Sequence, residues 1–306
     1  MPRVSIVIPT HNSAAYLAQT LDSVCQQTFK DFEVVLVDDG SQDCTLDEAR
    51  RFAVAFDLRV VPQANAGPGA ARNTGIRAAR GHYCAFLDAD DLMLPERLGE
   101  QVAQLDEQPQ LGLSHTDLMT FDDSGIVHRT RHAFSSPCGG HVLERLLVDN
   151  FITTSTVMAP TVRLIEAGLF NTRRRIAEDF ALWLAMAERW PVGYVQRPLV
   201  CYRRRPGSLS NDKLLTSLAA LDVIQSFWDS HGEYRMQNRD VWRRSLSAHL
   251  SFAGAAALHR HNLADACRYL LRSLRFDPAN AAAWKQLAKL ALIPLRDHAS
   301  TVRQSS

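Results

Sequence analysis

The sequence predicts an α/β fold, a mostly parallel sheet with helices on both faces, together with an all-α C-terminal extension. Three observations predict it. Short runs of Val, Ile and Leu alternate with amphipathic stretches near the N-terminus, and polar residues interrupt the ends of those runs. After about residue 211 the pattern is helical alone. In sheets of this kind ligands bind beyond the carboxyl ends of the strands.

The N-terminal part alternates strand-like and helix-like segments. Strands are expected at 4–8, 33–39, 58–61 and 82–91, and helices at 14–27, 45–56 and 69–79. The strand segments are largely continuous apolar runs, as is typical of strands covered on both faces. Because parallel strands end at one edge of a sheet, the polar segments 9–12, 38–41 and 88–91 are expected together at that edge.

A second set of elements follows. Strands are expected at 113–121, 153–159 and 193–203, with a helix at 178–190. We therefore predict one domain over 1–210, with halves 1–107 and 108–210, and a helical extension over 211–306.

The extension contains a repeat signal. Leu250 and Trp284 are separated by the period of a tetratricopeptide repeat, and Gly254, Ala266 and Pro278 stand at suitable positions between them. This pattern predicts one to one and a half such repeats. A plain helical extension is the alternative.

Composition limits the classes of partner. The 306 residues include 34 basic and 33 acidic side chains and have a net charge of +1, which argues against nucleic-acid binding through phosphate neutralisation. Six scattered cysteines without a C-x-x-C pair are expected to be reduced, and no leader pattern is seen, so we predict a cytoplasmic protein.

The amphipathic run 285–296 predicts peripheral contact with the inner face of the plasma membrane, with a core helix as the alternative.

Three carboxylates follow the expected strand at 82–91. In an extended chain the period of two places Asp88 and Asp90 on one side, where they could share Mg²⁺ or Mn²⁺ with a diphosphate. The ion would relieve the repulsion among Asp88, Asp90 and Asp91. The alternative is a solvated turn that caps the helix beginning near Pro95.

Asp38 and Asp39 end the strand expected at 33–39 and lead into a Gly-Ser turn. A carboxylate at a sheet edge can accept hydrogen bonds from a ligand's N–H or hydroxyl groups. The alternative is a turn in which Ser41 or Asp43 caps the following helix.

Six motifs occur in order: VSIVIPTHN (4–12), VDDGSQDCT (37–45), NAGPGAARNTG (65–75), FLDADD (86–91), EDFALW (178–183) and YRRRPGSLS (202–210). Together they closely resemble family 2 glycosyltransferases, the inverting enzymes with the GT-A fold, a Rossmann-like fold for nucleotide-diphospho-sugars. The resemblance covers about the first 210 residues, so 1–107 would be the nucleotide-binding half and 108–210 the acceptor-side half.

The resemblance implies a role for each matching residue. The nucleotide side would comprise Asp39, reading the base, with Asp38 and Thr10 in the same pocket, Arg72 near the ribose and phosphates, and Asp88 near them.

The reacting side would comprise Asp90 as metal ligand and Asp179 as catalytic base, with Glu178 as its rival. Arginines 203–205 could hold the departing diphosphate; relatives often carry histidine at the position of Arg205.

The resulting expectation is metal-dependent, inverting transfer of a single sugar from a nucleotide-sugar donor, a UDP-sugar first among them. The acceptor would be a saccharide or lipid-linked molecule in cell-surface polysaccharide or lipopolysaccharide synthesis. Processive relatives carry Q-x-x-R-W, of which only Arg189 and Trp190 are present. One alternative is a GT-A-like scaffold protein that acts through its helical tail. The other is a sugar nucleotidyltransferase, which would need basic residues in the loop 8–16 to hold a triphosphate; this loop has no lysine or arginine.

Overall fold

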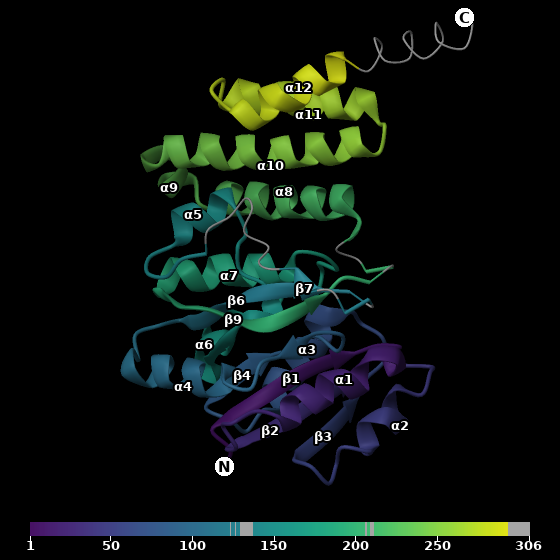
Figure 1. Ribbon diagram of the computed structural model, residues 1–306. Helices are drawn as coiled ribbons and strands as arrows, with labels where there is room; N and C mark the ends of the chain where they lie inside the picture. The colour runs from purple at the N-terminus through teal and green to yellow at the C-terminus, as the bar shows by residue number, and fades with distance from the viewer. Residues whose placement is uncertain (123, 126, 129–136, 206, 209–210, 293–306) are drawn as a thin grey trace, which may run out of the picture. The chain divides into compact units, whose positions relative to one another are not determined.

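The structure is a computed structural model that describes residues 1–122, 124–125, 127–128, 137–205, 207–208 and 211–292. The chain divides into two compact units (Figure 1). Unit 1 comprises Met1–Leu143 and Phe151–Gly207, and unit 2 comprises Glu144–Asn150 and the chain from Ser208 onward.

Unit 1 contains a mixed sheet. Among the described residues the sheet has nine strands, in the order β3-β2-β1-β4-β8-β6-β9-β5, with β7 paired to β6. Their bounds are β1 Val4–Thr10, β2 Phe32–Asp38, β3 Asp57–Pro62, β4 Tyr83–Phe86, β5 Leu92–Met93, β6 Leu113–Phe121, β7 Val127–His128, β8 Met158–Pro160 and β9 Val192–Arg203.

Strands β3, β2, β1 and β4 run parallel, and β6 runs parallel to β9. Strand β8 pairs antiparallel with both β4 and β6, and so joins the two parallel sets. The predicted α/β class is confirmed, with antiparallel pairs concentrated in the second half.

Helices cover both faces of the parallel strands (Figure 1). They are α1 Ala14–Cys25, α2 Thr45–Arg50, α3 Pro68–Ala78, α4 Arg97–Glu107, α6 Thr161–Glu166 and α7 Glu178–Arg189. Alternate residues of β2 face opposite layers: Val34 belongs to the apolar cluster that includes α1 and α4, whereas Val35 packs with Ala71 of α3. The continuous apolar strands of the sequence therefore reflect burial on both sides.

Two expected elements are shorter than the pattern predicted. Helix α2 ends at Arg50, and turns follow it. Strand β4 ends at Phe86, and residues 88–91 form a turn in which the amide of Asp91 donates to the carbonyl of Asp88 at 3.1 Å. The expectation that Asp88 and Asp90 lie on one side of an extended strand is therefore wrong.

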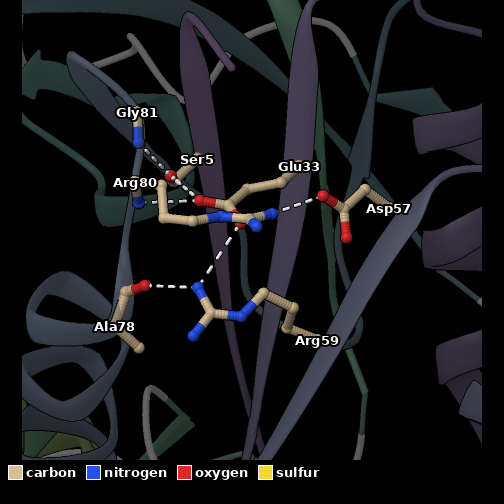
Figure 2. A network of polar contacts seen from close by, with 7 residues as sticks. All are labelled: Ser5, Glu33, Asp57, Arg59, Ala78, Arg80 and Gly81. Carbon is tan, nitrogen blue, oxygen red and sulfur yellow. Dashed lines mark hydrogen bonds and ion pairs between the residues drawn. The ribbon is translucent and has the colours of Figure 1, made fainter. Parts of the chain in front are cut away.

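A buried carboxylate organises the opposite edge of the sheet (Figure 2). Glu33 lies near the start of β2 with no exposed surface. Its Oε1 accepts the hydroxyl of Ser5 and the amide of Arg80, each at 2.7 Å, and its Oε2 accepts Nε of Arg80 at 2.7 Å. Nη1 of Arg59 lies 3.5 Å from Oε2 and donates to the carbonyl of Ala78 at 2.6 Å. This network fixes the turn between α3 and β4, far from the carboxyl ends of the strands.

Unit 2 is helical. Its longer helices, α8, α10, α11 and α12, pack as successive neighbours (Figure 1). The helices are α8 Lys213–Ser230, α9 Gly232–Gln237, α10 Arg239–His259, α11 Leu263–Phe276 and α12 Ala281–Ala291, and α5 Leu143–Val148 begins at the boundary between the units. Side chains of Asp212, Asn262 and Asn280 cap α8, α11 and α12. The tetratricopeptide assignment stays a prediction.

The run 285–296 lies partly in α12, and its residues 293–296 fall outside the described residues. Across the described ranges, no helix has the length and apolar character needed to cross a membrane. All six cysteines, each within the described part of the chain, are free thiols.

Candidate active site

The carboxyl ends of β1, β2 and β4 bring the three polar segments to one edge of the sheet, as the sequence predicted. The segments after β1 and β2 are tied together. The amide of Asn12 donates to the hydroxyl of Ser41 at 3.0 Å, and its side-chain oxygen accepts the amide of Gln42 at 2.8 Å.

Asp39 is buried and holds the loop that leads into α3. Its Oδ1 accepts Nε2 of Gln63 at 2.7 Å and the amide of Ala66 at 2.8 Å, and its Oδ2 accepts the amide of Gly67 at 2.8 Å. Gly67 has φ of +89° and precedes Pro68, the first residue of α3. Because a carboxylate offers about four acceptor positions, three donors leave room for roughly one more.

Asp38 and Thr10 are also engaged within the fold. The carboxylate of Asp38 accepts the amide of Ser41, three residues further on, at 3.3 Å. The hydroxyl of Thr10 donates to the carbonyl of Val37 at 3.2 Å, and its own carbonyl accepts the amide of Asp39 at 2.8 Å. Both side chains lie at the predicted place and are almost fully buried.

The turn at 88–91 is held from several sides. The amide of Asp88 donates to the hydroxyl of Ser155 at 3.1 Å, and the carbonyl of Ala89 accepts the hydroxyl of Thr20 at 2.9 Å. These contacts anchor the turn to α1 and to η1 (Thr154–Thr156).

Asp91 does not cap a helix. It is fully buried, and its Oδ1 accepts the amide of Arg203 at 2.9 Å. Burial, together with the charges of Asp88 and Asp90, raises the pKa of Asp91 well above its usual value. The side chain thus fastens the end of β9 to the turn.

Arg72 connects the turn with the start of α7. Its Nη2 pairs with Oδ1 of Asp88 at 2.7 Å, and its Nη1 pairs with Oε1 of Glu178 at 2.8 Å. The side chain of Arg72 is 7% exposed. Burial raises the pKa of Glu178 to about 7, and Arg72 opposes that shift. Arg72 therefore orients two carboxylates from separate elements.

Asp179 is the more accessible member of the Glu-Asp pair. The hydroxyl of Thr154 donates to its Oδ2 at 2.7 Å. Thr154 was not predicted as a site residue, because the sequence pattern of 153–159 indicated only a strand. Glu178, by contrast, is nearly fully buried and paired with Arg72.

Asp90 is paired with Arg205. Nε of Arg205 lies 2.5 Å from Oδ2 of Asp90, and the guanidinium carbon lies 5.3 Å from the ring centre of Tyr16. Burial lowers the pKa of Arg205, but the bond to Asp90 more than offsets that effect, so the pKa is raised. Arg203 donates from Nε to the carbonyl of Asp90 at 2.9 Å. Arginines thus relieve the repulsion among the acidic residues that the sequence analysis assigned to a metal.

The donor set fits a divalent cation only in part. Within the described ranges, no group of three or more His, Cys, Asp and Glu side chains is arranged to hold a metal ion. Asp90 has a carboxylate that is 21% exposed. Mg²⁺ and Mn²⁺ are commonly bound by one or two carboxylates together with substrate phosphates, and Asp90 fits that mode.

The comparison with known families decides the class of protein. The pattern of glycosyl transferase family 2 matches residues 5–170, more than half of the chain. The chain belongs to glycosyl transferase family 2. The predicted enzyme class, glycosyltransferase, is confirmed at the level of the family. Four of the six motifs that carried the resemblance lie within or overlap the matched region, and the motifs at 178–183 and 202–210 lie beyond it.

Relatives of this family 2 chain are glycosyltransferases by name. A Rickettsia felis protein is 32% identical over 197 residues, which are 64% of this chain and 32% of the relative. Glycosyltransferase GlyG of Streptococcus pneumoniae is 28% identical over 73% of this chain and 78% of its own length. The chain spans about a third of the length of the Rickettsia felis relative.

Solved structures share the fold. S. aureus TarS 1–349 in complex with UDP-GlcNAc is 18% identical with a TM-score of 0.57 over 88% of this chain and 89% of that one. The mannosyltransferase PcManGT from Pyrobaculum calidifontis, in complex with GDP-Man and Mn²⁺, is 21% identical with a TM-score of 0.61 over 94% and 87%. The predicted GT-A fold is confirmed for this family 2 chain.

Proposed function

We propose that this chain transfers a single sugar from a nucleoside-diphosphate sugar to an acceptor hydroxyl, with inversion at the sugar carbon. One arrangement supports the proposal above all. Asp179, partly exposed and oriented by Thr154, stands next to Glu178, which Arg72 joins to Asp88 at the carboxyl edge of the sheet. A base for the acceptor and the acidic turn for the donor are thereby connected through one buried arginine.

Asp179 is the proposed catalytic base. A hydroxyl that attacks opposite to the leaving diphosphate must lose its proton, and a base within hydrogen-bond reach contributes about 10² to 10⁴ in rate. Glu178 is a poorer candidate because it is buried and its charge is paired with Arg72. We assign Glu178 and Arg72 to positioning.

The proposed nucleotide side comprises Asp39, Asp38 and Thr10, with the remaining acceptor position of Asp39 available to a base N–H. TarS binds UDP-GlcNAc and PcManGT binds GDP-Man, which supports a sugar nucleotide as donor; a UDP-sugar is our first choice.

Asp90 is the proposed ligand of Mg²⁺ or Mn²⁺, and the Mn²⁺ in the PcManGT complex supports a divalent cation. A bound cation would stabilise the negative charge that develops on the departing diphosphate. Arg205 is proposed to contact that diphosphate as well, because a guanidinium matches the geometry of phosphate oxygens.

The proposed acceptor is a saccharide or a lipid-linked molecule of cell-surface polysaccharide or lipopolysaccharide synthesis, made at the cytoplasmic side of the membrane. The named residues do not select among acceptors. Peripheral membrane contact through 285–296 is proposed on its basic and apolar pattern alone.

The test is a screen of nucleotide sugars with Mn²⁺ and with Mg²⁺, reading release of the nucleoside diphosphate. Asp179→Asn should lower turnover by about 10² to 10⁴ while donor affinity is kept. Glu178→Gln should lower it less. Unchanged turnover in Asp179→Asn would refute the base assignment, and release from no sugar nucleotide would refute the proposed reaction.

A further inference from the structure

The two carboxylates of the D-x-D element are each paired with an arginine, but the two pairs differ. Asp88 pairs with Arg72, whose side chain is 7% exposed and is also bound to Glu178. Asp90 pairs with Arg205, whose side chain is 35% exposed. Arg72 is therefore buried and shared between two carboxylates, whereas Arg205 is partly exposed; the carboxylate side chains are 31% exposed at Asp88 and 21% exposed at Asp90.

We propose that Arg205 is the resident counter-ion of Asp90 and that a divalent cation must displace its guanidinium before the cation can bind. This inference rests on the proposed function, because it assigns the cation to Asp90. It adds that the arginine contact and the cation contact exclude each other, so that loading the cation releases Arg205.

Electrostatic repulsion is the reason that the cation and the guanidinium of Arg205 cannot both bind Asp90. Nε of Arg205 lies 2.5 Å from Oδ2 of Asp90, so a cation bound to the same carboxylate would lie within a few ångströms of a positive guanidinium. Like charges at that separation repel, most strongly where solvent is partly excluded. Asp90 is only 21% exposed, so water screens the repulsion incompletely.

Once released from Asp90, Arg205 would be placed to bind the diphosphate. Arg203 is fixed by its bonds to the carbonyl of Asp90 and to the carboxylate of Asp91, so the end of β9 stays at the acidic turn. Arg205, two residues further on, would then lie beside any diphosphate that accompanies the cation. A guanidinium binds phosphate oxygens through paired donors, so the arginine would move from one anion to another.

The test measures Mn²⁺ binding to the full chain by electron paramagnetic resonance of free Mn²⁺, first with Mn²⁺ alone and then with UDP added. Arg205→Gln should bind Mn²⁺ alone more tightly than the unmodified chain, by up to about fivefold, the order expected when a partly exposed ion pair no longer competes. Arg205→Lys keeps the charge and should stay within about twofold of the unmodified chain.

Two controls fix the interpretation. Asp90→Asn should lose this Mn²⁺ binding whichever residue stands at 205. Arg197→Gln removes an arginine of β9 that pairs with Glu100, and should leave the Mn²⁺ affinity unchanged. With UDP and Mn²⁺ together, Arg205→Gln should bind UDP more weakly, because the diphosphate loses its arginine.

Equal Mn²⁺ affinity in the unmodified chain and in Arg205→Gln, with binding abolished by Asp90→Asn, would overturn the exclusion and leave the cation assignment intact. Absence of Mn²⁺ binding in both, with and without UDP, would overturn the exclusion together with the proposed cation site. A melting curve for each variant confirms that it is folded.

Discussion

The hydroxyl of Thr154 donates a hydrogen bond of 2.7 Å to Oδ2 of Asp179, and the amide of Phe180 donates to Oδ1 of the same carboxylate at 2.7 Å. The first donor comes from η1 and the second from α7 itself. Two donors on different elements fix the plane of the carboxylate. If Asp179 is the base, as proposed, it is already oriented before an acceptor arrives.

Replacing Thr154 by valine should therefore impair catalysis without unfolding the chain. Valine has nearly the same shape but donates no hydrogen bond, so Asp179 would lose its orientation and gain rotational freedom. We expect kcat to fall about tenfold, the order found when a supporting contact to a catalytic group is lost. Sugar-transfer kinetics at saturating donor would measure it.

Thr154→Ser is the matched control, because serine keeps the hydroxyl and loses only a methyl group. Its kcat should stay within about threefold of the unmodified chain if the hydroxyl is what matters. Equal losses in the serine and valine variants would show that packing, and not the hydrogen bond to Asp179, is responsible.

The parallel half of the fold could be predicted from the sequence because its central strands, β1 and β2, are buried on both faces. The segments expected at 4–8 and 33–39 contain the apolar runs VSIVI and VVLV, and β1 and β2 lie within two residues of these segments at either end. A buried strand of this kind can be recognised from the pattern of neighbouring residues alone. The order of strands β8, β6 and β9 depends on long-range pairing, which no local pattern encodes.

The residues of the candidate site were proposed from sequence motifs, but the contacts among them were not predicted. Asp88, Asp90, Arg72 and Arg205 were all identified by motif. That Asp88 and Asp90 each pair with an arginine was not predicted, because each pair joins different segments of the chain and depends on tertiary structure. The turn at 88–91 was missed because the alternation of an extended strand was assumed to continue past Phe86.

Glu178 should make stability depend on pH near neutrality. Burial raises its folded-state pKa to about 7 from a usual value of 4.5, although Arg72 opposes the shift. Between those two pH values the folded chain binds more protons than the unfolded chain, so the free energy of unfolding falls as the pH rises through this window.

Glu178→Gln removes that titration. The fall in unfolding temperature between pH 5 and pH 8 should be smaller in the variant than in the unmodified chain, as differential scanning calorimetry would measure. Parallel curves, with the same separation at both pH values, would contradict the raised pKa of Glu178.

Glu33→Gln should destabilise unit 1. The buried carboxylate accepts bonds from Ser5 and from two nitrogens of Arg80, and glutamine can reproduce only part of this set (Figure 2). Lost hydrogen bonds to a charged group predict a cost of about 2–3 kcal/mol in the free energy of unfolding. Chemical denaturation at pH 7 would measure it.

At acidic pH the difference in the free energy of unfolding between Glu33→Gln and the unmodified chain should become smaller. Burial raises the pKa of Glu33, but the bonds from Ser5 and Arg80 outweigh that effect, so the pKa is lowered overall. The stability due to its charge is therefore present at neutral pH and lost as the pH falls through that lowered value. Asp57→Asn, on the half-exposed partner of Arg80, should change stability by less than about 1 kcal/mol.

Gly254→Ala should destabilise unit 2, although alanine is the better helix former. Gly254 lies inside α10, and a Cβ there would stand 2.7 Å from Cγ and Cδ2 of Leu270 on α11. Overpacking typically costs about 1–3 kcal/mol, whereas the gain in helix propensity is about 1 kcal/mol. Since the neighbouring atoms belong to a buried leucine, we expect a net loss of about 1–2 kcal/mol.

Gly232→Ala separates the two effects. Gly232 is the first residue of α9, and a Cβ there would meet nothing within 4 Å. The substitution should be neutral or stabilise by up to about 1 kcal/mol, because only backbone entropy changes. Thermal unfolding of both variants measures the difference. If Gly254→Ala were as stable as Gly232→Ala, the close approach of α10 to Leu270 would not be needed for the packing of these helices.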